Sequence, residues 1–324
     1  MNLLIKSFLN FCYSNKFLKT IIEKYIQKLK KFYGCDILIR RAAVAGQFYR
    51  GEPNSLRKSI EECFLHKDVG PGVLPRDVDR HNRREIIAIV SPHAGYMYSG
   101  PVAAHGYLEL WKDRIEPPDT VIIIGPNHHG GITIATMERG GWETPFGVVE
   151  IDEEVAKTLT KKNDKIQHDV YSHTYEHSIE VQLPFLQYLY GSDFKFVPIC
   201  MLSHSFKVCK IVGDAVAAVI KEQKQKDIII IASTDFTHFE PHESARIKDS
   251  KAIAAIEKLN PELLFNTVNN ERISMCGVDP TTAMLIAANQ LNAQKAKTLK
   301  WASSGDIIPD KHSVVGYGSI IITK

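Results

Sequence analysis

The stretch TVIIIGPNHHGG, residues 120–131, joins a buried-strand pattern directly to two adjacent histidines. Residues 120–124 are β-branched and apolar, which favours a strand covered on both faces. Gly125 and Pro126 then break the pattern. His128 and His129 follow at once, and a loop that only turns the chain has little need of two imidazole rings. The stretch therefore predicts a chemical site at the end of a buried strand.

Similar apolar runs alternate with helical patterns along the rest of the chain. Strands are predicted over 86–90, 120–124, 132–137, 194–200, 227–232 and 314–322, and helices over 55–65, 101–111, 153–162, 177–190, 205–224, 245–258 and 280–291. This alternation predicts an α/β fold with a central, mostly parallel or mixed sheet covered by helices on both faces. No repeat and no linker interrupts the pattern, so a single domain is expected over residues 41–324.

Composition excludes several classes of protein. The 324 residues are 44% hydrophobic and 24% charged, which is ordinary for a globular chain. The formal net charge of +3 is too weak to indicate a nucleic-acid partner. Six cysteines are scattered without a C-x-x-C pair, and no secretory signal is visible. A reducing, cytoplasmic location is therefore expected.

Residues 1–40 differ from the rest of the chain. Seven lysines and one acid, Glu23, fall within residues 1–33, and the apolar residues there have nearly helical spacing. This pattern predicts a basic amphipathic extension. Three interpretations stay open: a helix packed on the body or on a second subunit, a helix on a membrane surface, or a segment upstream of the true start. Its uncharged stretch is too short to span a bilayer.

Histidines follow three of the predicted strands. His93 comes after 86–90, His128 after 120–124, and Asp235 and His238 after 227–232. One histidine at a strand end is usually only a loop residue that makes hydrogen bonds. Because the carboxyl ends of parallel strands meet at one edge of a sheet, three such ends together predict a shared metal or catalytic site.

Two further segments carry candidate residues. In YEHSIEVQLPFLQYL, residues 175–189, Glu176 and Glu180 would share a helix face, with His177 on the turn before it, as acid–base groups or supports of a metal site. The alternative for Glu176 is a favourable interaction with the helix dipole. In SMCGVDPTTAM, residues 274–284, Cys276 precedes a helix expected to open with Asp279 as N-cap and Pro280 at N1. A thiol there tends toward thiolate, although spacing alone favours a small packing residue.

Several of these motifs together resemble the MEMO family. They are AGQFY (45–49), SPHAGYMYSG (91–100), GPNHHG (125–130), EHSIEVQLPF (176–185), STDFTHF (233–239) and CGVDP (276–280), in family order from about residue 41 to the C-terminus. The family pattern begins near RRAAVAGQFYRGEP, so residues 1–40 are either an addition to it or a mis-assigned start. The resemblance implies a fold like that of the class III extradiol dioxygenases, which are non-haem iron enzymes.

The resemblance also implies a ligand set. The two metal histidines correspond to His93 and His128, the third ligand to Cys276, and the acid–base histidine to His238, with Asp235 fixing its tautomer. His129 would then orient the loop or touch the pocket. Tyr96 would either stack on an aromatic ligand or only pack its loop. A thiolate in place of a carboxylate shifts preference toward iron or copper, with zinc as an alternative.

Three functions fit this site. The first is a metal-dependent oxidoreductase acting on an unknown small molecule. The second is a non-catalytic adaptor that binds a ligand or peptide in the same pocket. The third is a zinc-type hydrolase in which His238 serves as base. No nucleic-acid partner is expected, whereas contact of residues 1–33 with a membrane surface and an oligomeric state both stay open.

Overall fold

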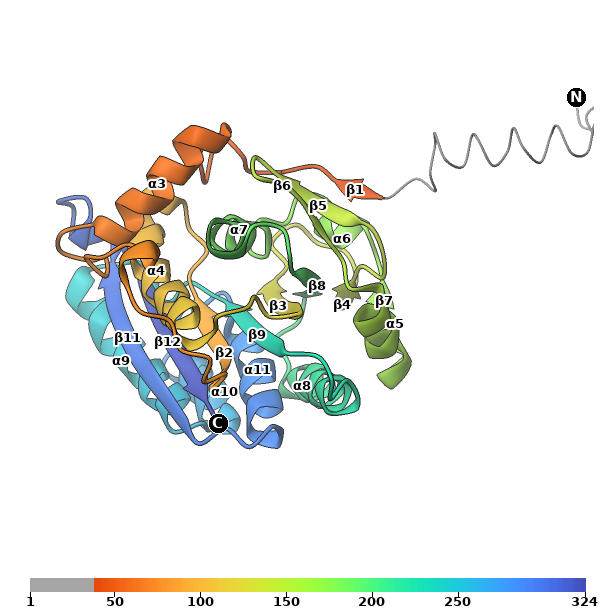
Figure 1. Ribbon diagram of the computed structural model, residues 1–324. Coiled ribbons are helices and arrows are strands. Elements are labelled where there is room, and N and C mark those ends of the chain that lie inside the picture. The colour runs from red at the N-terminus through yellow and green to blue at the C-terminus, as the bar shows by residue number, and fades with distance from the viewer. Residues whose placement is uncertain (1–37) are drawn as a thin grey trace, which may run out of the picture. The chain divides into compact units, whose positions relative to one another are not determined.

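The computed structural model describes residues 38–324, so the extension predicted over residues 1–33 lies outside the described part of the chain. Residues Ile39–Lys324 form one compact unit. Its nine-stranded sheet has the order β10-β12-β2-β9-β3-β8-β4-β7, with β11 paired to β12 (Figure 1). The strands are β2 (Ile86–Ser91), β3 (Thr120–Pro126), β4 (Ile134–Thr136), β7 (Gln167–His168), β8 (Lys195–Met201), β9 (Ile228–Ser233), β10 (His238–Glu240), β11 (Lys295–Ser303) and β12 (Val314–Thr323).

The four central strands β2, β9, β3 and β8 are parallel neighbours. Their residues are almost all buried, as expected for strands covered on both faces. β12 runs antiparallel to β2, and β4 runs antiparallel to β8, so the sheet is mixed. The predicted α/β fold class is confirmed. Because the four central strands are parallel, their carboxyl ends meet at one edge of the sheet.

Helices cover the two faces of the sheet. The β2-α4-β3 and β8-α8-β9 crossovers move in opposite directions along the sheet, so right-handed connections put α4 and α8 on opposite faces. α11 packs on α8 and on β9, whereas α3 packs on α4. The α-helices are α3 (Pro53–Leu65), α4 (Tyr96–Asp113), α5 (Glu153–Lys162), α6 (Tyr171–Thr174), α7 (Leu183–Tyr190), α8 (Phe206–Glu222), α9 (His242–Glu257), α10 (Pro261–Asn270) and α11 (Val278–Gln290). Within residues 38–324, no helix combines the length and apolar character needed to cross a membrane.

A second, three-stranded sheet has the order β1-β5-β6. β1 (Ile39–Arg40) lies parallel to β5 (Gly141–Thr144), which forms an antiparallel pair with β6 (Gly147–Glu150). Sequence patterns did not predict this sheet. This sheet holds the first described residues against the rest of the protein, and the Arg40 side chain points inward and is 3% exposed.

Several helix starts differ from expectation, and two of these differences shape the site. The helix predicted over 177–190 begins only at Leu183, after a short 3-10 turn over Glu180–Gln182. Pro184 has no N–H to bond the carbonyl four residues earlier, so the α-helix does not extend back to His177. Glu176 and Glu180 therefore share no helix face. The helix predicted from Pro280 begins at Val278, with Gly277 as N-cap instead of Asp279.

Candidate metal centre

His93 lies two residues beyond β2 and is 2% exposed. Its Nδ1 lies 2.9 Å from the Oγ of Ser233. That hydroxyl donates its single hydrogen to the carbonyl of Ser178 at 2.6 Å and accepts from the amide of Gln182 at 2.8 Å. Nδ1 of His93 is therefore the protonated nitrogen, and Nε2 carries the lone pair. Burial and the neighbouring histidines lower the pKa of His93 well below its ordinary value, so the ring stays neutral.

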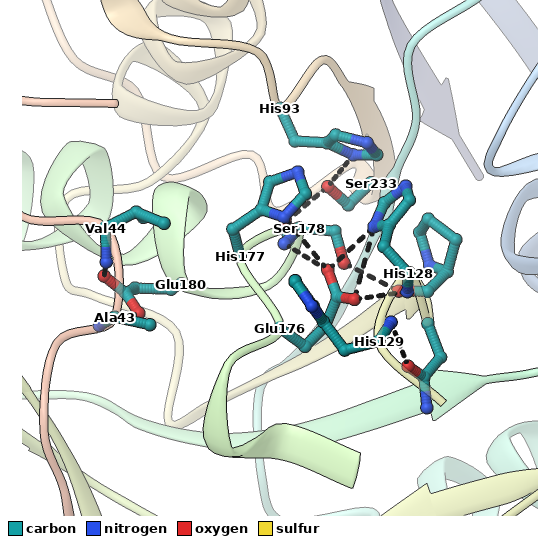
Figure 2. A network of polar contacts seen from close by, with 12 residues as sticks. Ala43, Val44, His93, His128, His129, Glu176, His177, Ser178, Glu180 and Ser233 are labelled. Carbon is teal, nitrogen blue, oxygen red and sulfur yellow. Dashed lines mark hydrogen bonds and ion pairs between the residues drawn. The ribbon is translucent and has the colours of Figure 1, made fainter. Parts of the chain in front are cut away.

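His128 lies two residues beyond β3 and is held by Glu176. Its backbone N–H donates to one carboxylate oxygen at 2.6 Å, and its Nδ1 lies 3.0 Å from the other (Figure 2). Burial opposes ionisation of Glu176, but the hydrogen bonds and charge of His128 lower the pKa of this carboxyl far below its usual range. Because a carboxylate only accepts, Nδ1 of His128 is the donor. Burial opposes protonation of the ring, but the hydrogen bond and charge of Glu176 raise the pKa of His128 above its ordinary value, so a metal that binds Nε2 displaces a proton there.

Cys276 is brought to these histidines by the close approach of two loops. The N–H of Gly277 donates to the Thr234 hydroxyl at 3.0 Å, and a Cβ at Gly277 would lie only 2.4 Å from the Cβ of Thr234. Only glycine lets the loops pack this closely. The N–H of Asp235 then points at Cys276 Sγ over 3.3 Å, and Sγ lies 3.2 Å from Nε2 of His93.

The protonation of Cys276 differs from the sequence expectation. Burial and the charge of Asp235 raise the pKa of the thiol above its ordinary value. Without a cation beside it the group is a thiol, although it lies just before a helix. Desolvation outweighs the helix N-terminus here, and a bound cation would reverse this because coordination deprotonates a thiol.

His177 is a fourth member of the cluster. One ring nitrogen from each of His93, His128 and His177 lies within 4.8 Å of the other two, so these three residues could hold a metal ion. The His177 ring stacks on that of His128 at 4.7 Å, and burial lowers the pKa of His177 to about 4. The sequence predicted His177 to be a pocket residue or a support of the metal site. The position of His177 directly after Glu176, which binds His128, is the sequence signal that places it at the centre.

His238 and Asp235 lie beside this cluster but do not pair as the resemblance implied. Nδ1 of His238 lies 2.8 Å from the carbonyl of Ser274, which can only accept, so this carbonyl fixes the tautomer and leaves Nε2 as the base. Asp235 instead accepts the backbone N–H of His93 at 2.8 Å. Burial raises the pKa of Asp235 to about 6. Asp235 therefore orients the His93 loop.

Glu180 lies away from the histidines. Figure 2 shows its carboxylate directed at Ala43 and Val44, whose N–H groups donate to it at 2.8 and 3.1 Å. It also forms a buried ion pair with Arg40 and accepts from the hydroxyl of Tyr49 at 2.5 Å. The sequence predicted Glu180 to be an acid–base group or a support of the site, but these contacts bind it to residues 40–49 instead.

Tyr96 and His129 occupy different surroundings. Tyr96 is 4% exposed, packs against Phe185, and donates its hydroxyl to the carbonyl of Val181 at 2.6 Å. These contacts correspond to the packing alternative for Tyr96. The backbone of His129 donates to the side chain of Asn127 at 3.0 Å, and the ring is exposed 6.2 Å from that of His177.

The donor set fits a metal ion. Two histidines present Nε2 as the nitrogen available to a metal, because their Nδ1 atoms donate to Ser233 and Glu176. Such a carboxylate–histidine pair is the usual support of a metal-binding imidazole. Two ligands on one tetrahedral ion, a nitrogen and a sulfur, lie about 3.5 Å apart. The 3.2 Å between Nε2 of His93 and Sγ of Cys276 is close to that spacing.

The fold and this cluster define a class: an α/β protein with a candidate metal site at the carboxyl edge of its parallel strands. A family model described as Memo-like protein matches residues 40–321, and the chain belongs to this family. The resemblance seen in its motifs is confirmed.

Curated relatives carry the name MEMO1 family protein. One from Methanopyrus kandleri is 47% identical over 88% of this chain and 99% of the relative. One from Sulfurisphaera tokodaii is 45% identical over 87% and 99%, and one from Saccharolobus islandicus 44% over 86% and 97%. A solved structure of an uncharacterized Escherichia coli K12 protein aligns at a TM-score of 0.49 with 14% identity, covering 73% of this chain and 99% of that one.

Proposed function

We propose that the chain is a metal-dependent oxidoreductase in which His93, His128 and Cys276 hold the ion and His238 moves a proton. The main support for this proposal is that hydrogen bonds fix the orientation of the His93 and His128 rings. Nδ1 of His93 and Nδ1 of His128 are bound to Ser233 and Glu176, so Nε2 is the metal-facing nitrogen of each ring, and Nε2 of His93 lies 3.2 Å from the thiol of Cys276.

Each residue has one task in this proposal. Glu176 holds the His128 ring and balances positive charge, while Ser233 and Asp235 hold the ring and backbone of His93. Nε2 of His238 is free to take or return a proton, because its Nδ1 is bound to Ser274. A bound iron or copper ion would supply electron transfer and Lewis acidity. The thiol sulfur favours these ions over magnesium or calcium.

Loading the protein anaerobically with ferrous iron, cuprous copper or zinc in separate samples tests the proposal. The oxidoreductase class predicts oxygen uptake in the presence of ascorbate for the iron or copper form and none for the zinc form. His93→Ala should lose this uptake. If only the zinc form is active, and it hydrolyses 4-nitrophenyl acetate, the chain is a hydrolase and the proposal is wrong.

Glu176→Gln tests the support of His128. Glutamine has nearly the shape of glutamate but carries no charge. Its amide NH2 group would face Nδ1 of His128 unless the amide rotates. We expect metal affinity to fall about 10- to 100-fold with the fold retained. Competition with a colorimetric chelator measures the change. Glu143→Gln on the exposed part of β5 is the matched control and should leave affinity unchanged. Equal affinities for wild type and Glu176→Gln would contradict the role of Glu176.

A further inference from the structure

Phe239 combines two unusual features. Its backbone has φ of 58°, in the left-handed region that residues other than glycine, asparagine and aspartate rarely occupy. Its ring is 77% exposed, so no packing in the core explains the residue. Glycine would adopt this backbone at lower cost. A bulky aromatic residue at such a position indicates a use for the ring outside the fold.

The surrounding chain forces this conformation. Pairing of β10 with β12 shifts register between His238 and Glu240, so Phe239 is the extra residue of a bulge. On one side, the N–H of His238 donates to the Ser274 hydroxyl at 2.7 Å. On the other side, the Glu240 carboxylate accepts from Lys248 at 2.6 Å. With both neighbours anchored, the bulge directs the Phe239 side chain into solvent.

We propose that Phe239 is a specificity-determining residue that packs against an aryl group of a small-molecule substrate bound at the candidate metal centre. This inference rests on the proposed function. The Phe239 ring lies 5.8 Å from the ring of His238, edge to face, so it borders the base whose Nε2 is free. A second exposed ring, Tyr175, is 65% exposed and lies 6.5 Å from the ring of His129. Exposed aromatic rings thus lie beside two histidines of this edge, which suits an aromatic ligand.

The experiment compares two metal-binding probes, imidazole and 4-phenylimidazole, on the cobalt(II)-loaded protein. The visible spectrum of cobalt reports binding of both. We expect Phe239→Ala to weaken 4-phenylimidazole about fivefold and to leave imidazole within about twofold, because only the aryl contact is lost. Ile247→Ala, which removes an exposed side chain on α9, is the control and should change neither. Equal effects on both probes, or none, would overturn the inference.

Two further outcomes keep this test decisive. If wild type gives no bound-cobalt spectrum, the proposed function fails and the inference fails with it. If wild type binds cobalt and both probes but Phe239→Ala does not discriminate between them, only the inference fails.

Thermal melting of a third variant tests the strain at Phe239. Phe239→Gly should melt about 2 °C above Phe239→Ala, because glycine adopts the left-handed backbone without strain. A lower melting temperature for the glycine variant would remove the argument from strain.

Discussion

Replacing Arg40 by alanine should lower the free energy of unfolding by about 3–5 kcal/mol, because it leaves the buried carboxylate of Glu180 without its cation. Glu180 has a fully buried side chain, and Arg40 is 3% exposed. Arg40 also lies over the Trp142 ring at 4.1 Å. Urea unfolding followed by fluorescence measures the change.

A neighbouring arginine is the control for this prediction. Arg41 pairs with Glu143 at the surface, with its side chain 82% exposed, so Arg41→Ala should lower the free energy of unfolding far less than Arg40→Ala. Similar decreases in the free energy of unfolding for the two variants would show that the buried Arg40–Glu180 pair stabilises the fold no more than a surface pair does.

Arg40 also links the fold to the site. Its guanidinium donates to the carbonyls of His173 and Glu176, at 2.6 and 2.7 Å. These carbonyls lie on the segment that carries Glu176 and His177. We therefore expect Arg40→Ala to weaken metal binding as well, even under conditions where the variant is folded.

The identity of the third metal ligand gives the second large effect. If Cys276 is that ligand, Cys276→Ala should lose more than about 100-fold in metal affinity, beyond the range of supporting residues. His177→Ala should lose about tenfold or less, because its ring packs on Phe48 at 4.7 Å and its Nδ1 is 3.6 Å from Glu176. Cobalt(II) titration measures both affinities. The sulfur-to-cobalt charge-transfer band should disappear only in Cys276→Ala.

The reverse ranking would contradict this ligand set. Retained affinity in Cys276→Ala with loss in His177→Ala would mean that the three histidines hold the ion and that the thiol only lies nearby. Among the described residues, the ring nitrogens of His93, His128 and His177 lie within 4.8 Å of one another, whereas the Sγ of Cys276 is placed against one of these ligands, 3.2 Å from Nε2 of His93.

The sequence predicted the central strands because they are buried on both faces and therefore uniformly apolar. β9 (Ile228–Ser233) is the clearest case. β11 was missed because it pairs only with β12 and carries lysines at 295, 297 and 300, so it lacks an apolar run. The β5–β6 pair was missed because its strands are short and its partner β1 is distant in sequence.

For the candidate site, the sequence predicted which residues lie at the strand ends, but it did not predict which groups they contact. His93 and His128 follow strands whose parallel order is set by the crossovers, so their convergence could be predicted. The binding of Nδ1 of His238 to the Ser274 carbonyl, and of Glu180 to residues 40–49, depends on how loops pack. The late start of the helix at Leu183 could have been predicted from Pro184, and this late start leaves Glu176 outside the helix.

Elemental analysis of the protein, purified without added metal and without a histidine tag, tests the central claim most directly. Wild type and His93→Ala would be measured side by side by mass spectrometry. We predict about one equivalent of iron or copper per chain in wild type and its loss in His93→Ala. Absence of metal from both proteins, even after reconstitution under reducing conditions, would contradict the metal centre.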